Sequence, residues 1–213
     1  MGALDVVGLL ADFDAKLVRE RELLEASARN IQILQGHEDE PLRWYADLKF
    51  FILQIDLDIT TLVAALLRHP NSRLTMEKYL ALVIFETESD IGKIANGFQK
   101  SLRNPEVVTA TSFDGDIVTA ALEKFKDALK PMRDDSAFMA RLGLVRNTMA
   151  GHVWDGRGTR VNSSAMWALS RPAHDASPEA VLLDEFVQHA ITVRSALGRL
   201  SADLEDSFTL REH

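Results

Sequence analysis

The sequence contains no cysteine among its 213 residues. This absence excludes a disulfide framework, a thiolate nucleophile and a thiolate metal site. It is also consistent with a reducing compartment. A chain of this length buries enough surface to hold a core without a covalent or metal staple. We therefore expect one domain spanning residues 1–213.

Proline and glycine are scarce, with 6 and 11 residues. The few glycines form neither a G-x-G-x-x-G nor a G-x-x-x-x-G-K phosphate loop, and no G-x-S-x-G nucleophile turn is present. A di-metal site in a helical bundle uses Glu-x-x-His, because this spacing places both ligands on one helix face. The residues three positions before His37, His69, His152, His174 and His189 are Leu34, Leu66, Met149, Arg171 and Phe186. The sequence thus predicts no metal and no cofactor.

Positive charge is also limited, because 24 basic residues face 32 acidic ones and the net charge is −8. Such a molecule is not a nonspecific polyanion binder, so any nucleic-acid contact must be local. The most apolar run, 50–67, is interrupted by Gln54, Asp56 and Asp58. Two aspartates near a bilayer centre argue against a membrane-spanning helix. We expect a cytoplasmic protein with no membrane contact.

Apolar residues recur at three- and four-residue steps throughout the chain, which indicates helices. No segment shows a persuasive period-two strand pattern. The prediction is an all-α, antiparallel bundle of five to six helices, with a long loop at about 154–177. The expected helices cover about 4–34, 41–68, 73–102, 114–129, 136–150 and 178–204.

Four short sequences mark the ends of these helices. Gly36 suits the left-handed residue after the first helix, and Pro41 suits the first turn of the second. His69-Pro70 ends that helix, after which Asn71 or Ser72 can cap the third. Ser177-Pro178-Glu179 is a strong helix start. The last helix carries the clearest apolar stripe, made of Leu183, Phe186, Ala190, Val193, Leu197, Leu200 and Leu204.

The segment Leu142–Val153 differs from the other helix ends. It carries Arg146 and Asn147, followed by Gly151 and His152. A continuous helix would place Arg146 and His152 roughly 120° apart. Gly151 can end the helix in a left-handed turn and let His152 fold back. The guanidinium can then hold a phosphate while the imidazole moves a proton. Such a pair suits cleavage of an RNA phosphodiester, where the 2′-hydroxyl is the nucleophile.

Basic residues are concentrated around this segment. Between Lys124 and Arg171 nine basic residues face four acidic ones, a balance of 9 − 4 = +5. A local phosphate-binding face would have this composition. Trp154 and Trp167 can stack on bases. The candidate RNA-binding residues are Arg141, Trp154, Arg157 and Arg160.

The sequence from Arg146 to His152 resembles the R-x(4–6)-H motif of HEPN domains, in which a polar residue such as Asn147 often follows the arginine. The preceding apolar residues Leu142, Leu144 and Val145 also fit. The resemblance implies a compact helical bundle and a metal-independent endoribonuclease. It also implies a homodimer with a composite cleft and a role as a toxin or in abortive infection and antiviral defence, with a possible antitoxin partner. By transfer, Arg146 would polarise the scissile phosphate, His152 would assist proton transfer and Asn147 would position the pair.

Two other interpretations remain open. The chain can be a non-catalytic interaction module, in which the stripe of the last helix is either core or a dimer seam and the basic stretch binds an acidic partner. A nucleotide- or small-molecule-binding bundle is less favoured, because no phosphate loop is present. The carboxylates on the second and third helices are expected to be solvated or paired with arginine rather than catalytic. These carboxylates are Asp56, Asp58, Glu86, Glu88 and Asp90.

Overall fold

The computed structural model describes residues 6–104, 111–145 and 177–210. Three long helices come first: α1 (Val6–Leu34), α2 (Glu40–Arg68) and α3 (Arg73–Arg103). Gly36 has a φ of 77°, so the left-handed turn predicted after the first helix is confirmed. The Asp39 carboxylate accepts the Leu42 N–H at 2.9 Å and caps α2, with Pro41 in its first turn. The α1–α2 boundary therefore follows from local chemistry.

The α2–α3 connection is a 3₁₀ turn, Pro70–Ser72. His69 donates its N–H to the carbonyl of Ala65, and its own carbonyl accepts the Ser72 N–H at 2.8 Å. The expected break at His69-Pro70 is confirmed. Ser72 is the cap residue of α3, one of the two positions expected, but its hydroxyl makes no cap hydrogen bond. The N–H groups of Ser72 and Arg73 instead donate to the carbonyls of His69 and Pro70 in the 3₁₀ turn.

The described residues also contain two three-residue strands, which no sequence pattern indicated. β1 (Thr111–Phe113) pairs antiparallel with β2 (Phe208–Leu210), with Phe113 opposite Phe208. Three residues are too few to show a period-two pattern. The pair is supported by an aromatic cluster, in which the Phe113 ring lies 5.2 Å from that of Phe208 and 5.3 Å from that of Tyr45. The strand pair thus joins the segment before α4 to the segment that follows the last described helix.

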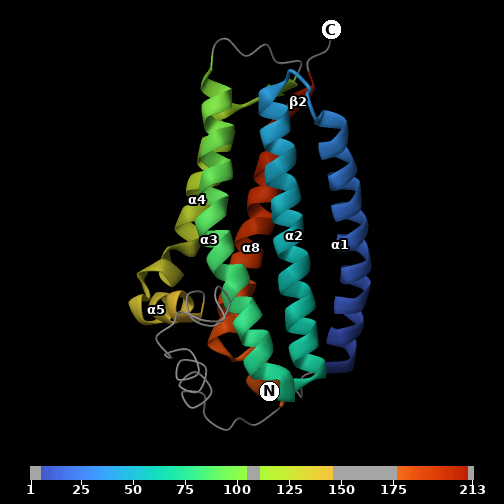
Figure 1. Cartoon of the computed structure of the whole chain (residues 1–213), viewed down its shortest axis with the longest axis vertical. Coiled ribbons are helices and arrows are strands. Elements are labelled where there is room, and N and C mark those ends of the chain that lie inside the picture. The colour runs from blue at the N-terminus through green and yellow to red at the C-terminus, as the bar shows by residue number, and fades with distance from the viewer. Residues whose placement is uncertain (1–5, 105–110, 146–176, 211–213) are drawn as a thin grey trace, which may run out of the picture.

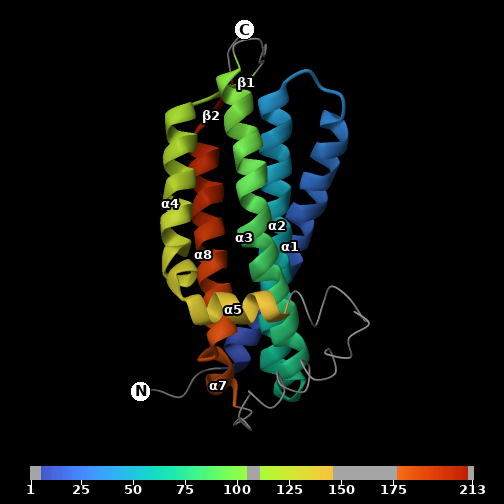
Figure 2. The same cartoon turned by 60° about the vertical axis from the view of Figure 1, so that its left-hand side comes forward.

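Helix α4 (Gly115–Asp134) continues five residues beyond its expected end at Leu129 and contains Pro131 in its last turns. α5 (Ser136–Leu144) follows after Asp135, whose carboxylate accepts the Phe138 N–H at 2.9 Å. Figure 2 shows α5 lying across the bundle rather than along it. The part of this helix expected over 146–150 lies outside the described residues, as do positions 154–176 of the expected loop.

The last predicted helix is two helices. α7 (Pro178–Leu182) begins at the expected Ser177 cap, whose hydroxyl accepts the Ala180 N–H at 3.2 Å. The chain then breaks, and α8 (Glu185–Asp206) starts with Asp184 as its cap. Leu183 lies in the break and is 79% exposed, so its place in the apolar stripe was wrong. The other six stripe residues are buried, which makes them core rather than a dimer seam.

The described residues form a mostly helical bundle with seven α-helices, against the five to six expected. The seventh helix arises because the last predicted helix divides into α7 and α8. α2 is the central element and packs against α1, α3 and α8, while α4 packs on α8. Figure 1 shows α2 between α1 and α3, with α8 alongside. The largest fully buried side chains are Phe98, Phe138, Phe186, Leu48, Ile59, Leu66, Leu80, Ile84, Leu129, Met132, Leu142 and Leu197.

By length and composition, α2 is long and apolar enough to cross a membrane. The central helix of a soluble bundle has the same composition, because it is covered on several sides. Here α2 is covered by α1, α3 and α8. Its Asp56 forms an ion pair with Arg194, which is a contact within the bundle. The packing is thus compatible with a soluble protein.

Candidate functional site

Of the seven residues predicted to act on RNA, only Arg141 falls within the described ranges. The other six, Arg146, Asn147, His152, Trp154, Arg157 and Arg160, lie outside them. The described residue immediately before this group is Val145, at the end of α5. The part of the candidate site that the structure describes is therefore α5, the helix that leads into the motif, together with the residues that contact α5.

The apolar face of α5 fixes this helix to the bundle. Leu142 and Val145, two of the apolar residues that precede the motif, are completely buried. Phe138 is also completely buried, and its ring lies 5.3 Å from that of Phe186 on α8. Leu144 is 42% exposed, as expected for a residue on the opposite face. α5 thus reaches the start of the motif as a packed element.

Arg141 is a half-exposed residue that joins α5 to the first turn of α8. Its Nη2 lies 2.5 Å from Oε1 of Glu185, and its guanidinium lies 6.0 Å from the centre of the Phe138 ring. The Nε of Arg141 is buried and has no hydrogen-bond acceptor within the part of the chain that the structure describes. Arg141 therefore has a structural partner, and its predicted role in binding RNA stays a prediction.

Other basic side chains before the motif are also paired with acids. Lys124 lies 2.9 Å from Asp203, and Arg133 lies 2.8 Å from Glu88. Lys126 pairs with its neighbour Glu123 on the same helix at 2.7 Å. The positive balance counted along the sequence is thus largely compensated in space over the described basic residues. The Arg133–Glu88 pair also agrees with the expectation that the acids of the third helix are paired.

A cluster of three possible metal ligands lies beside Arg141. One ligand atom from each of Asp135, Glu185 and His189 lies within 4.8 Å of the other two. Burial lowers the pKa of His189, as does Arg141, while Glu185 and Asp135 oppose the shift. The sequence search for Glu-x-x-His missed this cluster, because Glu185 precedes His189 by four residues. Residues four apart also share a helix face, so that spacing was the available signal.

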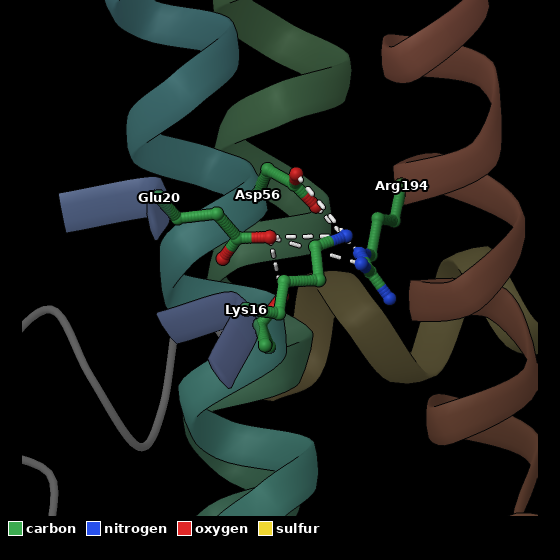
Figure 3. Close-up of polar contacts among 5 residues, drawn as sticks. Lys16, Glu20, Asp56 and Arg194 are labelled. Carbon is green, nitrogen blue, oxygen red and sulfur yellow. Dashed lines mark hydrogen bonds and ion pairs between the residues drawn. The ribbon is translucent and has the colours of Figure 1, made fainter. Parts of the chain in front are cut away.

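A second polar cluster connects α1, α2 and α8 (Figure 3), where Lys16 and Arg194 approach the carboxylates of Glu20 and Asp56. The Nζ of Lys16 lies 3.0 Å from Glu20 and 3.6 Å from Asp56. Arg194 lies 2.5 Å from Asp56 and 3.7 Å from Glu20. This cluster holds two acids and two bases, so it ties the outer helix α1 to the bundle without net charge.

The carboxylates of this cluster are in a low-dielectric environment. Burial raises the pKa of Asp56 to about 6, and the nearby Glu20 adds to the shift while Lys16 opposes it. The side chain of Glu20 is only 5% exposed. An adjacent cavity of about 570 Å³ is lined in part by Lys16, Arg19, Glu20 and Asp56. The cluster can hold a proton near neutral pH, and nothing in its contacts suggests a nucleophile.

Comparisons with protein-family models, with curated proteins and with solved structures gave no match for this chain. The HEPN resemblance therefore depends on the motif and its helical context.

Proposed function

We propose that the protein is a metal-independent endoribonuclease of the HEPN type, acting on single-stranded or loop RNA as a toxin or antiviral-defence factor in the cytoplasm. The observation that carries this proposal is the Arg146–His152 motif, which follows a helix of the bundle directly. The proposal includes an antiparallel HEPN-like arrangement of the helices. It also includes a homodimer in which two motifs form one cleft.

The proposed reaction needs only groups that the motif and the RNA supply. The guanidinium of Arg146 binds the scissile phosphate through its planar fork of donors. The 2′-oxygen of the RNA attacks phosphorus and loses its proton, and the 5′-oxygen leaves as a hydroxyl. His152 transfers the proton, because an imidazole titrates near neutral pH. Asn147 positions the two side chains. The products are a 2′,3′-cyclic phosphate and a 5′-hydroxyl.

The packing of α5 supports this proposal, because a reaction of this kind needs its groups held in place. Leu142 and Val145 are completely buried, and Arg141 is paired with Glu185. The backbone therefore enters the motif from a fixed position on the bundle. Leu142 and Val145 are also two of the apolar residues on which the resemblance depends.

The test is cleavage of a labelled single-stranded RNA in the presence of EDTA. We expect Arg146→Ala and His152→Ala to lose activity at least 100-fold, in line with the usual contribution of an acid–base group. Arg103→Ala and His69→Ala are matched controls, because both residues are exposed and neither belongs to α5 or to the motif. They should retain full activity. A substrate with a 2′-deoxy nucleotide at the cleavage site should stay intact. Undiminished cleavage by both motif variants removes the mechanism.

The surface of α1 supports the alternative of a non-catalytic interaction module. Val7, Val18 and Ile33 on this helix are 80%, 62% and 76% exposed. At 100° per residue the three positions fall within about 80° of one another around the helix axis, which is the side of α1 that would face a partner. This alternative predicts no RNA turnover and a stable protein complex that Val18→Lys weakens. Cleavage that depends on Arg146 would decide between the two functions.

A further inference from the structure

Asp135, Glu185 and His189 bring together the ligand types of a divalent transition-metal site, although they come from two distant parts of the sequence. Asp135 lies between α4 and α5, and the other two lie on α8. Their ligand atoms lie within 4.8 Å of one another, and all three residues are partly buried. In a tetrahedral zinc site with bonds of about 2.0–2.2 Å, neighbouring ligand atoms are roughly 3.4 Å apart. The ligand atoms would therefore have to move closer together by up to about 1.4 Å when the metal binds.

The structure holds each of these side chains in place. Glu185 and His189 are separated by one helical turn and share a face of α8. One oxygen of Asp135 accepts the Phe138 N–H, and one oxygen of Glu185 faces Arg141, so each carboxylate has a second oxygen that can bind a metal. The imidazole of His189 lies 3.9 Å from the Phe138 ring, which limits its rotation. Supporting contacts of this kind orient ligands in metal sites.

Arg141 lies beside the cluster and carries one donor that no described residue satisfies. Its Nε is buried and has no acceptor among the described residues. A buried donor without an acceptor is costly, and ordered water or a bound ligand commonly satisfies it. The charges also agree, because two carboxylates and Arg141 leave a net charge of −1 before the metal binds.

We propose that Asp135, Glu185 and His189 bind one divalent transition-metal ion, with Zn²⁺ as the preferred ion and water in the fourth position. One imidazole and two carboxylates favour this class, because Mg²⁺ and Ca²⁺ take oxygen ligands and soft ions take thiolates. Three protein ligands and a water are typical of an open zinc site. The site does not depend on the proposed ribonuclease activity, which requires no metal.

The test is isothermal titration of the tag-free full chain with ZnCl₂ at pH 7.5, after removal of metals with EDTA and dialysis. We expect His189→Ala and Asp135→Asn each to weaken Zn²⁺ binding at least tenfold. Asparagine retains the side-chain oxygen that caps α5, so Asp135→Asn tests the charge with little effect on folding. His69→Ala is the matched control, because this exposed histidine lies at the α2–α3 turn. Mg²⁺ should give no heat, and Mn²⁺ should bind more weakly than Zn²⁺.

A second measurement keeps the result clear if His189→Ala folds poorly. Zn²⁺ should shift the imidazole NMR signals of His189 in the wild-type protein, and circular dichroism should report the helix content of each variant. Equal Zn²⁺ affinity in wild type, His189→Ala and Asp135→Asn overturns the proposal. A loss of Zn²⁺ affinity in His69→Ala as large as that in His189→Ala also overturns it. The ribonuclease proposal is judged separately, because Arg146→Ala should retain Zn²⁺ binding and wild-type cleavage should persist in EDTA.

Discussion

Arg194 on α8 lies with its Nε 2.5 Å from Oδ1 of Asp56 on α2, near the buried carboxylate of Glu20 on α1. This contact connects the central helix to α8 at the point where the outer helix α1 is also attached. The two carboxylates are close enough that the ionisation of one affects the other. Burial and Glu20 together raise the pKa of Asp56 to about 6. The ionisation of Asp56 therefore changes the stability of the folded protein near neutral pH.

The first prediction concerns the pH dependence of folding that Asp56 contributes. An aspartate in the unfolded chain titrates near 3.8, so between that pH and about 6 the folded state holds a proton that the unfolded state has lost. The contribution of Asp56 to the free energy of unfolding therefore falls as pH rises through this window. At about 1.4 kcal/mol per pKa unit, the loss reaches roughly 3 kcal/mol.

Asp56→Asn should remove this contribution while retaining an oxygen that can face Arg194. The free energy of unfolding of the variant minus that of wild type should increase by up to about 3 kcal/mol between pH 4 and pH 7. Urea denaturation at several pH values measures this difference. The carboxyl ¹³C signal of Asp56 should titrate with a midpoint near 6. A difference that does not change with pH would contradict the prediction.

The second prediction concerns Arg73, which pairs with two buried acids at the start of α3. Its guanidinium contacts Glu77 on the same helix and Asp184, the cap of α8. The side chains of Glu77 and Asp184 are 0% and 3% exposed. Arg73→Met removes the positive charge from two acids that are buried. We expect it to lower the free energy of unfolding by about 3–5 kcal/mol.

A matched control and a rescue separate the charge effect from packing. Arg21→Met removes an arginine whose pair with Glu25 is exposed, and it should change stability by no more than about 0.5 kcal/mol. Adding Glu77→Gln to Arg73→Met should recover part of the loss, because the buried negative charge that Arg73 neutralises is then also removed. If the double variant is no more stable than Arg73→Met in thermal unfolding, the cost comes from packing instead.

The helix ends show how far sequence reasoning reaches in this protein. Gly36, Pro41 and Ser177 were predicted as boundary residues and are found there, because each acts through its own backbone preference or a bond to a near neighbour. The break before α8 was missed. Asp184 begins a new helix there while also pairing with Arg73, which is 111 residues away in sequence. A partner at that distance leaves no local pattern, and the same holds for the three-residue strands.

The candidate site shows the same limit. The motif residues Arg146 and His152 can be recognised from the sequence because they lie close together along the chain. The charge balance around them was less informative, because Lys124 and Arg133 pair with Asp203 and Glu88 from other helices. Spatial neutralisation of this kind is set by helix packing. Asp135 and Glu185 likewise become neighbours only when α5 packs on α8.

The last prediction concerns Gly97, where the indole of Trp44 packs closely against α3. A Cβ added at Gly97 would lie 2.5 Å from Cη2 of Trp44, which is well inside van der Waals contact. Gly92 lies on the same helix, and a Cβ added there would meet no atom within 4 Å. Gly92→Ala should therefore stabilise the protein by about 0.5–1 kcal/mol through helix propensity. Gly97→Ala gains the same propensity but must displace the indole, so we expect a net loss of about 1–3 kcal/mol.

Thermal unfolding of both variants measures the contrast, and Trp44→Ala in the Gly97→Ala background should remove the clash. Equal stabilisation by the two glycine substitutions would show that the indole moves aside without cost.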